Sequence, residues 1–534
     1  MAYAHVTQAG SIYCERKKNS YKSSERTGHE MQKRIRCFLL LTFCLLIPAT
    51  TVCAETPYRS YDRTEWSTQL AAPDAYEPMF TVTGTQAGSG SLRTPSDFAF
   101  DSAGRLYIAD TGNSRIVILD QNMKFVKEIT TVTAENGQQD QLLSPTSVFV
   151  TDEGIIYLAD GDAARCLAIT ENGKILQEFV KPEDKTFTSE IFSPFKIMVD
   201  SKNMIYVISK NVFQGIMLYD AQGTFQGYYG SPSVDPSFRL LLDRFWKSVL
   251  SKEQREGLAR YVPVEYSNCC LDEQDFVYAT LSYTDSNKQQ LRRLNYMGNN
   301  IFPYVENFGE DEVFDYKREK WYTKFTGVAV ERNFIFALDS QWQRIYMFDK
   351  EGNRLAVFGT QGEQLGSFRS VQAILVRDGV VYVLDRLKQN ITVFAPTEYG
   401  KLIMDAVTLY SQGKYQEAIE PWQAVLARDA NNQMAYSGIG EAMMKAGDYK
   451  GAVHNFRLAY NYERESVAFE YYRSQLLREN IGIMVIFMLI LVVALMLFTN
   501  RKFLGLLGKK RRAAKEKRER RDDRTSSNHR RRIA

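Results

Sequence analysis

One short strand pattern recurs six times along this chain and constrains its fold more than any other feature. Each copy has a turn residue followed by apolar residues with an aromatic at the fourth position, as in GRLYIAD (104–110). A further strand precedes each copy, another follows it, and the copies begin 46 to 72 residues apart. The aromatic residues are Tyr107, Tyr157, Tyr206, Tyr278, Phe336 and Tyr382. Short strands repeated every 40–50 residues or so are typical of a β-propeller, whose blades stack radially because one blade cannot bury both faces alone.

The first copy also carries a polar signature around its turn. Asp110, Asn113 and Arg115 follow the central strand in the order Y-I-A-D, then N-x-R-I, with Pro95 near the preceding strand. This pattern resembles the NHL repeat. The acid and the arginine recur in the second and fifth copies, as Asp160 with Arg165 and Asp339 with Arg344. We expect the acid to accept backbone N–H groups and to pair with the arginine, which is a structural role.

The resemblance implies a mostly β fold, a six-bladed NHL-type β-propeller over residues 76–398. The lone strand at 76–85 is expected to complete the last blade, which closes the ring and removes the sheet edges. A helical insertion at 231–261 either folds onto the propeller rim or forms a surface for a partner or the membrane. A second insertion at 306–325 mixes acidic with aromatic residues and is expected to line the mouth of the central channel.

The period changes from strands to helices at residues 402–480. Two units align at an offset of 34 residues and share glycine, tyrosine, alanine and aromatic positions, and they resemble tetratricopeptide repeats. Matching pairs are Gly413 with Gly447, Tyr415 with Tyr449, Ala418 with Ala452, and Trp422 with Phe456. These helices form either a stiff neck or a concave peptide groove. Residues 465–480 resemble a third leading helix without a matching second helix, and we expect this helix to run directly into the membrane helix.

Two segments predict export and a single membrane anchor. Residues 31–54 have a basic start, a short apolar core and a small-residue cleavage site, as in a secretory signal peptide; residues 1–30 are interpreted as an upstream start-site artefact. Residues 481–499 are 19 residues without a charge, long enough to span a hydrocarbon core of about 30 Å. The tail, residues 500–534, is strongly basic, which predicts a cytoplasmic C-terminus and an extracytoplasmic ectodomain. The tail either contacts anionic lipid headgroups or docks a cytoplasmic partner.

The charge distribution argues against a nucleic-acid partner. Residues 501–534 carry a net charge of +11, whereas residues 55–500 carry −12. The positive charge therefore lies outside the folded body, where a nucleic-acid-binding domain would need it. Three cysteines remain in the body, which excludes a disulfide framework, and Cys269–Cys270 is interpreted as two buried thiols rather than a vicinal disulfide.

Candidate binding residues lie at the channel mouth. They are Asp97, Glu265, Trp321 and Tyr322. Six-bladed lactonases of the gluconolactonase type require a ring of oxygen ligands around one metal ion, and Asp97 and Glu265 are the only carboxylates entering the inner strands here. We therefore predict no catalytic residue, metal or cofactor, and keep a metal-dependent hydrolase of this class as the alternative.

The favoured interpretation is an extracytoplasmic, membrane-anchored binding or scaffold protein. Two interaction-type repeat modules precede one anchor, a layout similar to that of bacterial membrane-anchored proteins with NHL and tetratricopeptide repeats. The implied partners are the membrane and a protein, with a transporter complex as one candidate. A sensor that transmits ligand occupancy to the tail is the least favoured reading, because the tail contains no domain.

Overall fold

The computed structural model describes most of the chain after residue 55. The described residues are 56–63, 69–187, 189–231, 265–281, 290–302, 308–309, 311–314 and 319–530. The predicted leader, residues 1–54, lies outside them, and so does the predicted insertion 231–261 apart from Ser231.

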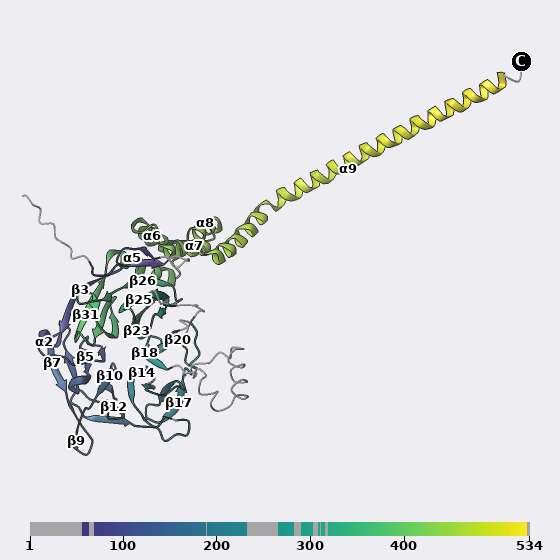
Figure 1. The fold of residues 1–534 in the computed structure, drawn as a ribbon. Coiled ribbons are helices and arrows are strands. Elements are labelled where there is room, and N and C mark those ends of the chain that lie inside the picture. Colours follow the sequence, from purple (N-terminus) through teal and green to yellow (C-terminus); the bar gives the residue numbers. More distant parts are fainter. Residues whose placement is uncertain are drawn as a thin grey trace, which may run out of the picture. The chain divides into compact units, whose positions relative to one another are not determined.

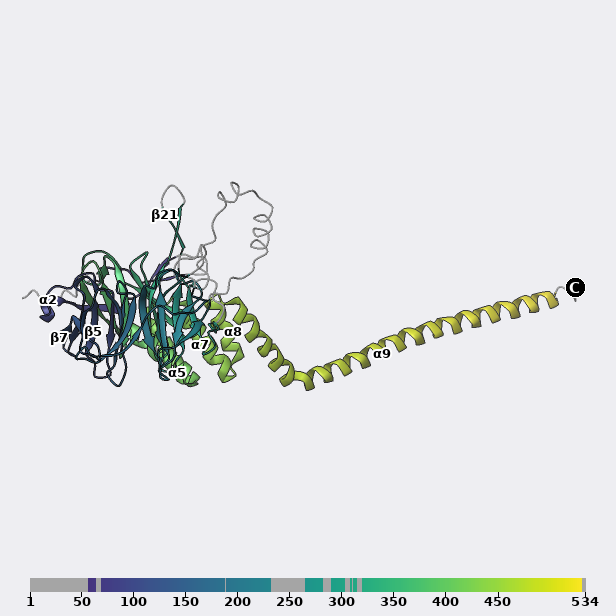
Figure 2. The same ribbon diagram turned by 90° about the horizontal axis from the view of Figure 1, so that it is seen from below.

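Six antiparallel sheets form the blades of a propeller. Figure 1 shows them as a ring, and Figure 2 shows the same ring from its edge. The first three blades have four strands each, paired in chain order. Their strands are β4 (Asp97–Phe100), β5 (Leu106–Asp110), β6 (Arg115–Leu119) and β7 (Phe125–Ile129); β10 (Pro145–Val150), β11 (Ile156–Asp160), β12 (Arg165–Ile169) and β13 (Ile175–Phe179); β14 (Pro194–Val199), β15 (Ile205–Ser209), β16 (Ile216–Tyr219) and β17 (Phe225–Tyr229).

The remaining three blades complete the ring. They comprise β18 (Tyr266–Leu271), β19 (Val277–Leu281) and β20 (Leu291–Leu294); β23 (Phe325–Glu331), β24 (Phe334–Asp339), β25 (Arg344–Asp349) and β26 (Arg354–Phe358); β29 (Val371–Arg377), β30 (Val380–Asp385), β31 (Asn390–Pro396) and β3 (Tyr76–Thr83). The N-terminal strand β3 pairs antiparallel with β31, from Tyr76 opposite Pro396 to Thr83 opposite Asn390. The predicted closure of the ring by this strand is therefore confirmed.

Short elements decorate the ring. They are β1 (Tyr61–Arg63) with β2 (Gln69–Ala71), α2 (Gly84–Ala87), β8 (Thr131–Thr133) with β9 (Gln139–Gln141), β21 (Asp311–Phe314) with β22 (Glu319–Tyr322), and β27 (Thr360–Gln361) with β28 (Ser367–Phe368). The hairpin β21–β22 lies in the insertion that was predicted to line the channel mouth.

The repeated aromatic residue explains why the blades stack. Tyr107 of the first blade packs in one cluster with Val148 and Leu158 of the second. The same arrangement recurs around the ring, so that each aromatic fills the core shared with the next blade: Tyr157, Tyr206, Tyr278, Phe336 and Tyr382. Burying one such side chain stabilises the fold by about 1.5–3 kcal/mol. The period read from the sequence is thus the period of the core between blades.

Helices follow the propeller. They are α5 (Glu398–Ser411), α6 (Tyr415–Arg428), α7 (Gln433–Ala446), α8 (Tyr449–Leu458) and α9 (Tyr462–Arg530). Asn432 caps α7 by accepting a hydrogen bond from Ala435 N at 2.7 Å, and Gly447 ends this helix with φ of 86°. The small residues of the repeat allow close packing, because a Cβ at Gly438 would lie 2.4 Å from Trp422 Nε1.

The propeller and the first helices share one hydrophobic core. Tyr76 stacks on Phe358 with ring centroids 4.6 Å apart, and the same cluster continues through Tyr399 and Ile403 to Trp422. Polar contacts support this junction, since Thr397, the N-cap of α5, donates its hydroxyl to Asp74 O at 2.6 Å. The helical repeats are therefore packed onto the last blades and are not a separate unit on a linker.

Helix α9 joins the repeats to the apolar segment without a break. Its first turns pack on α8, where Tyr449 stacks on Tyr471 at 5.4 Å. The prediction that residues 465–480 run directly into the apolar segment is confirmed. Within the described residues, the stretch Tyr462–Asp522 is the one helix long and apolar enough to cross a membrane.

Candidate functional site

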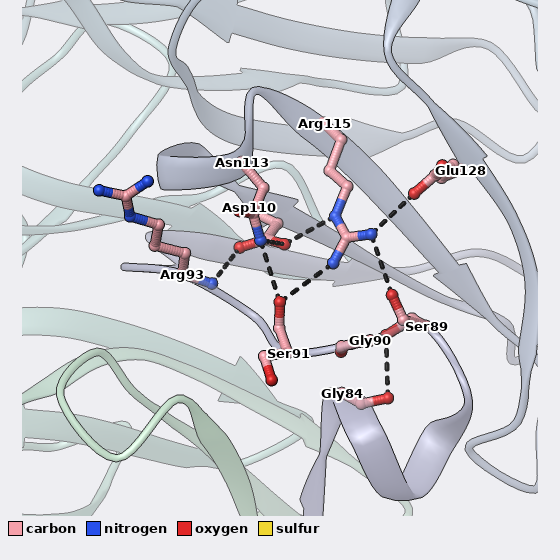
Figure 3. Close-up of polar contacts among 9 residues, drawn as sticks. All are labelled: Gly84, Ser89, Gly90, Ser91, Arg93, Asp110, Asn113, Arg115 and Glu128. Atoms are coloured by element: carbon pink, nitrogen blue, oxygen red, sulfur yellow. Dashed lines mark hydrogen bonds and ion pairs between the residues drawn. The ribbon is translucent and has the colours of Figure 1, made fainter.

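The turn between β5 and β6 holds the polar signature of the first blade (Figure 3). Asp110 is fully buried, and its Oδ1 accepts a hydrogen bond from Arg93 N at 2.6 Å. Its Oδ2 accepts from Asn113 Nδ2 and from Arg115 Nε, both at 2.8 Å. All of these donors belong to the same blade, so this carboxylate is used for structure.

Arg115 extends the cluster to the loop that enters the blade. Its guanidinium donates to Ser89 O at 2.9 Å and to Ser91 O at 3.3 Å, and it pairs with Glu128 at 2.7 Å (Figure 3). Because a guanidinium offers five donors in a fixed plane, one side chain can fix a carboxylate and a loop together.

The position equivalent to Asp110 makes the same contact in four other blades. There the last residue of the second strand accepts a hydrogen bond, through a side-chain oxygen, from a backbone N–H just before the first, innermost strand of the same blade. These pairs are Asp160 with Ser144 (2.7 Å), Ser209 with Ser193 (3.0 Å), Asp339 with Lys324 (2.9 Å) and Asp385 with Arg369 (2.7 Å). The predicted acceptance of backbone N–H groups by the aspartates is confirmed, and the predicted arginine pairs are seen for Asp110 with Arg115 at 2.8 Å and Asp160 with Arg165 at 3.5 Å. Serine supplies the acceptor in the third blade.

Asp97, the first predicted binding residue, begins the inner strand β4 and is buried. Lys196 of β14 donates to both carboxylate oxygens, at 3.0 and 2.9 Å. Ser147 of β10 donates its hydroxyl to Oδ2 at 2.5 Å, and Val148 N lies 3.3 Å from the same oxygen. Burial disfavours the charged form of Lys196, but the Asp97 carboxylate outweighs this effect and the pKa of Lys196 is raised. This ion pair thus joins the inner strands of the first and third blades, and the hydrogen bonds from Ser147 and Val148 add the inner strand of the second.

The other predicted residues have different surroundings. Glu265 immediately precedes β18 and accepts a hydrogen bond from Asn211 N at 3.0 Å. Partial burial raises the pKa of Glu265, and this hydrogen bond opposes the shift. Trp321 and Tyr322 end β22, where the backbone of Trp321 pairs with Glu312 and that of Tyr322 with Asp311. The structure therefore joins Asp97 to Lys196 and Ser147, whereas Glu265 contacts the third blade.

No group of three or more histidine, cysteine or acidic residues suited to a metal ion occurs in the described part of the chain. Cys166, Cys269 and Cys270 are free thiols. Burial raises the pKa of Cys269 to about 12, so this thiol stays protonated at neutral pH and is a poor ligand or nucleophile.

A cleft of about 550 Å³ lies between the fifth blade and the helical repeats. We call it the junction cleft. Glu351, in the turn between β25 and β26, forms part of the propeller wall, and the helical wall includes Tyr410, Tyr415, Trp422 and Glu441. Sequence reasoning missed it, because a turn and a helix face that are distant in sequence build its two walls. The aromatic residues of the repeat were the one available signal.

Comparisons with known proteins match both repeat types. Residues 92–119 match the NHL repeat family, and residues 406–428 match the tetratricopeptide repeat family. Among curated proteins, none matches the sequence of this chain.

Solved structures with a similar fold are distant in sequence. A streptogramin B lyase is 12% identical and a virginiamycin B lyase from Staphylococcus aureus is 10% identical; each aligns over 60% of this chain, and over 97% and 100% of its own, with TM-scores of 0.35 and 0.36. A structural genomics protein of unknown function from Bacteroides thetaiotaomicron aligns over 61% of this chain and 72% of its own, at 9% identity and a TM-score of 0.37.

Proposed function

We propose that this protein is a membrane-anchored scaffold that presents its propeller and helical repeats to a protein partner outside the cytoplasm. The observation that carries the proposal is the shared core of the two repeat modules, together with the helix that follows them and is long enough to cross a membrane. Rigid repeat modules offer large preformed surfaces, so this chain loses little conformational entropy when it binds a partner.

The topology is part of the proposal. The signal peptide places the propeller outside, residues 481–499 cross the bilayer once, and the basic tail after residue 500 stays in the cytoplasm. Eleven Lys/Arg side chains within residues 501–522 support this orientation, since basic residues flank spans on the cytoplasmic side. A membrane complex, such as a transporter assembly, is the candidate partner.

Polar groups at the centre of the propeller favour a scaffold over the hydrolase alternative. A metal-dependent hydrolase needs converging oxygen ligands, whereas the Asp97 carboxylate accepts hydrogen bonds from Lys196 and Ser147.

Crosslinking of the intact protein in its native membrane tests the proposal. Purification through the tail, followed by mass spectrometry, is expected to yield one reproducible membrane-protein partner joined to residues of the propeller or the helices. A preparation in which crosslinks join only lipids or copies of this chain contradicts the scaffold function.

A further inference from the structure

The fifth blade carries the same acid and arginine as the first two blades, but its arginine binds a different residue. In all three blades the acid and the arginine lie directly opposite each other on paired strands: Asp110 with Arg115, Asp160 with Arg165, and Asp339 with Arg344. The arginines of the first two blades pair with their acids. Arg344 instead donates to the Tyr61 hydroxyl at 2.9 Å, with its guanidinium 5.5 Å from the centre of the Tyr61 ring. Because the backbone register is the same, the difference lies in the direction of the arginine side chain.

Asp339 is left with one oxygen unpaired. This residue is fully buried, and its Oδ1 accepts hydrogen bonds from Lys324 N at 2.9 Å and Gln341 N at 2.8 Å. Its Oδ2 has no hydrogen-bond partner in the described part of the chain. In the first blade, the arginine donates to the corresponding oxygen of the acid. A buried acceptor without a donor is unfavourable, so Asp339 is a second place where the Arg344 guanidinium is stabilised.

The residue that holds Arg344 belongs to a hairpin near the start of the described chain. We call β1 (Tyr61–Arg63) and its partner β2 (Gln69–Ala71) the clasp. Strand β1 lies against β26, the outermost strand of the fifth blade. The chain before the clasp has its own anchor, since Tyr58 is buried and donates its hydroxyl to Tyr76 O at 2.6 Å. Arg344 therefore holds the clasp itself, through Tyr61.

The charge of Asp339 changes near neutral pH. Burial raises the pKa of Asp339 to about 7, hydrogen bonds from backbone N–H groups oppose this shift, and the charge of Arg344 opposes it least. Among the described residues, Arg344 is the one charged side chain that influences this pKa. The neutral carboxyl competes weakly for a guanidinium, whereas the buried carboxylate attracts it strongly. Tyr61 and Asp339 thus compete for one arginine, and the ionisation of Asp339 favours the second.

We propose that the clasp is a releasable element that Arg344 closes by binding Tyr61 and opens by turning to Asp339. The clasp is closed while Asp339 is neutral, and it opens as pH rises and Asp339 loses its proton. Opening uncovers part of β26, an outer sheet edge with which a further strand can pair. This inference goes beyond the scaffold function and does not depend on it.

Hydrogen exchange of the clasp tests the proposal in the full-length protein in detergent. Mass spectrometry gives the protection of the clasp amides, corrected for the intrinsic effect of pH on exchange. We expect this protection to fall about fivefold or more between about pH 6 and about pH 8.5, because local opening exposes these amides. Asp339→Asn cannot become charged and should keep the clasp protected at both pH values. Asp160→Asn removes an equally buried acid of the second blade and should keep the pH response.

Tyr61→Phe separates the exchange of partners from a purely structural contact. It keeps the ring and removes the hydroxyl that accepts from Arg344, so the clasp should lose protection at the lower pH and not at the higher one. Protection of the β24 amides confirms that each variant is folded.

Unchanged protection of the wild-type clasp across this pH range overturns the proposal. So does a pH response that persists in Asp339→Asn, or a loss in Tyr61→Phe that is equal at both pH values. None of these outcomes bears on the capture of a membrane partner by crosslinking, so the clasp and the scaffold function fail or stand separately.

Discussion

Removing Lys196 is expected to destabilise the propeller strongly, because it leaves the Asp97 carboxylate buried without its cation. The ammonium donates to both oxygens of Asp97, whose side chain is 5% exposed, and among the described residues only the Ser147 hydroxyl and Val148 N would remain as donors. Breaking a buried pair by removing one partner typically costs about 3–5 kcal/mol. An unfolding entropy of about 2.1 cal/mol/K per residue over roughly 320 residues converts this into a fall in Tm of about 4–8 °C.

The assay is thermal unfolding of the full-length protein in detergent, followed by circular dichroism in the β region. Lys196→Met is compared with Lys174→Met, which removes an exposed lysine of the second blade. The double variant Asp97→Asn with Lys196→Met removes both charges. Its Tm should fall less than that of Lys196→Met alone, because no unpaired charge is left buried. If Lys196→Met and Lys174→Met unfold within 1–2 °C or so of each other, the reasoning about the buried pair is refuted.

Three further predictions address the core, the pH dependence and the helical repeats. Tyr107→Ala should cost about 3–5 kcal/mol in denaturant unfolding, because the cavity opens between two blades, whereas Tyr107→Phe should cost much less; equal losses would contradict the packing role. Burial raises the pKa of Asp339 to about 7, so the unfolded chain releases this proton first and stability falls as pH rises from about 4 to about 7. Asp339→Asn should reduce the fall in Tm between about pH 4 and about pH 7, and an unchanged fall would show that Asp339 is not the group that titrates. Gly438→Ala should destabilise the repeats by about 1–3 kcal/mol, since its Cβ meets Trp422, whereas Gly482→Ala, whose Cβ meets no protein atom within 4 Å, should not destabilise the protein, because alanine favours a helix more than glycine does.

The features that the sequence predicts best are local or periodic. Two of them, the aromatic positions and the Asp110–Arg115 pair, depend on a pattern within one blade. The ring closure by residues 76–85 follows because the exposed edge of the last blade needs a strand to pair its backbone N–H and C=O groups. The helical repeats were found for the same reason, although α5 begins at Glu398, before the predicted start at residue 402.

The features that the sequence does not predict depend on contacts between distant residues. Asp97 was expected at the channel mouth as a binding residue, and its partner Lys196 lies 99 residues further along the chain. Nothing in either local pattern indicates that pairing. The junction cleft escaped prediction likewise, because Glu351 belongs to a β-turn and Glu441 to a helix, and only the packing of α5 onto the last blades brings them together.

The central claim is that this chain works as part of a membrane complex. The most direct measurement is the mass and composition of the intact protein extracted in native membrane nanodiscs, without detergent or crosslinker. The account predicts particles heavier than one copy of the chain without its signal peptide and the associated lipid, in which mass spectrometry finds a second membrane protein in a fixed ratio. Particles that contain this chain alone would contradict it.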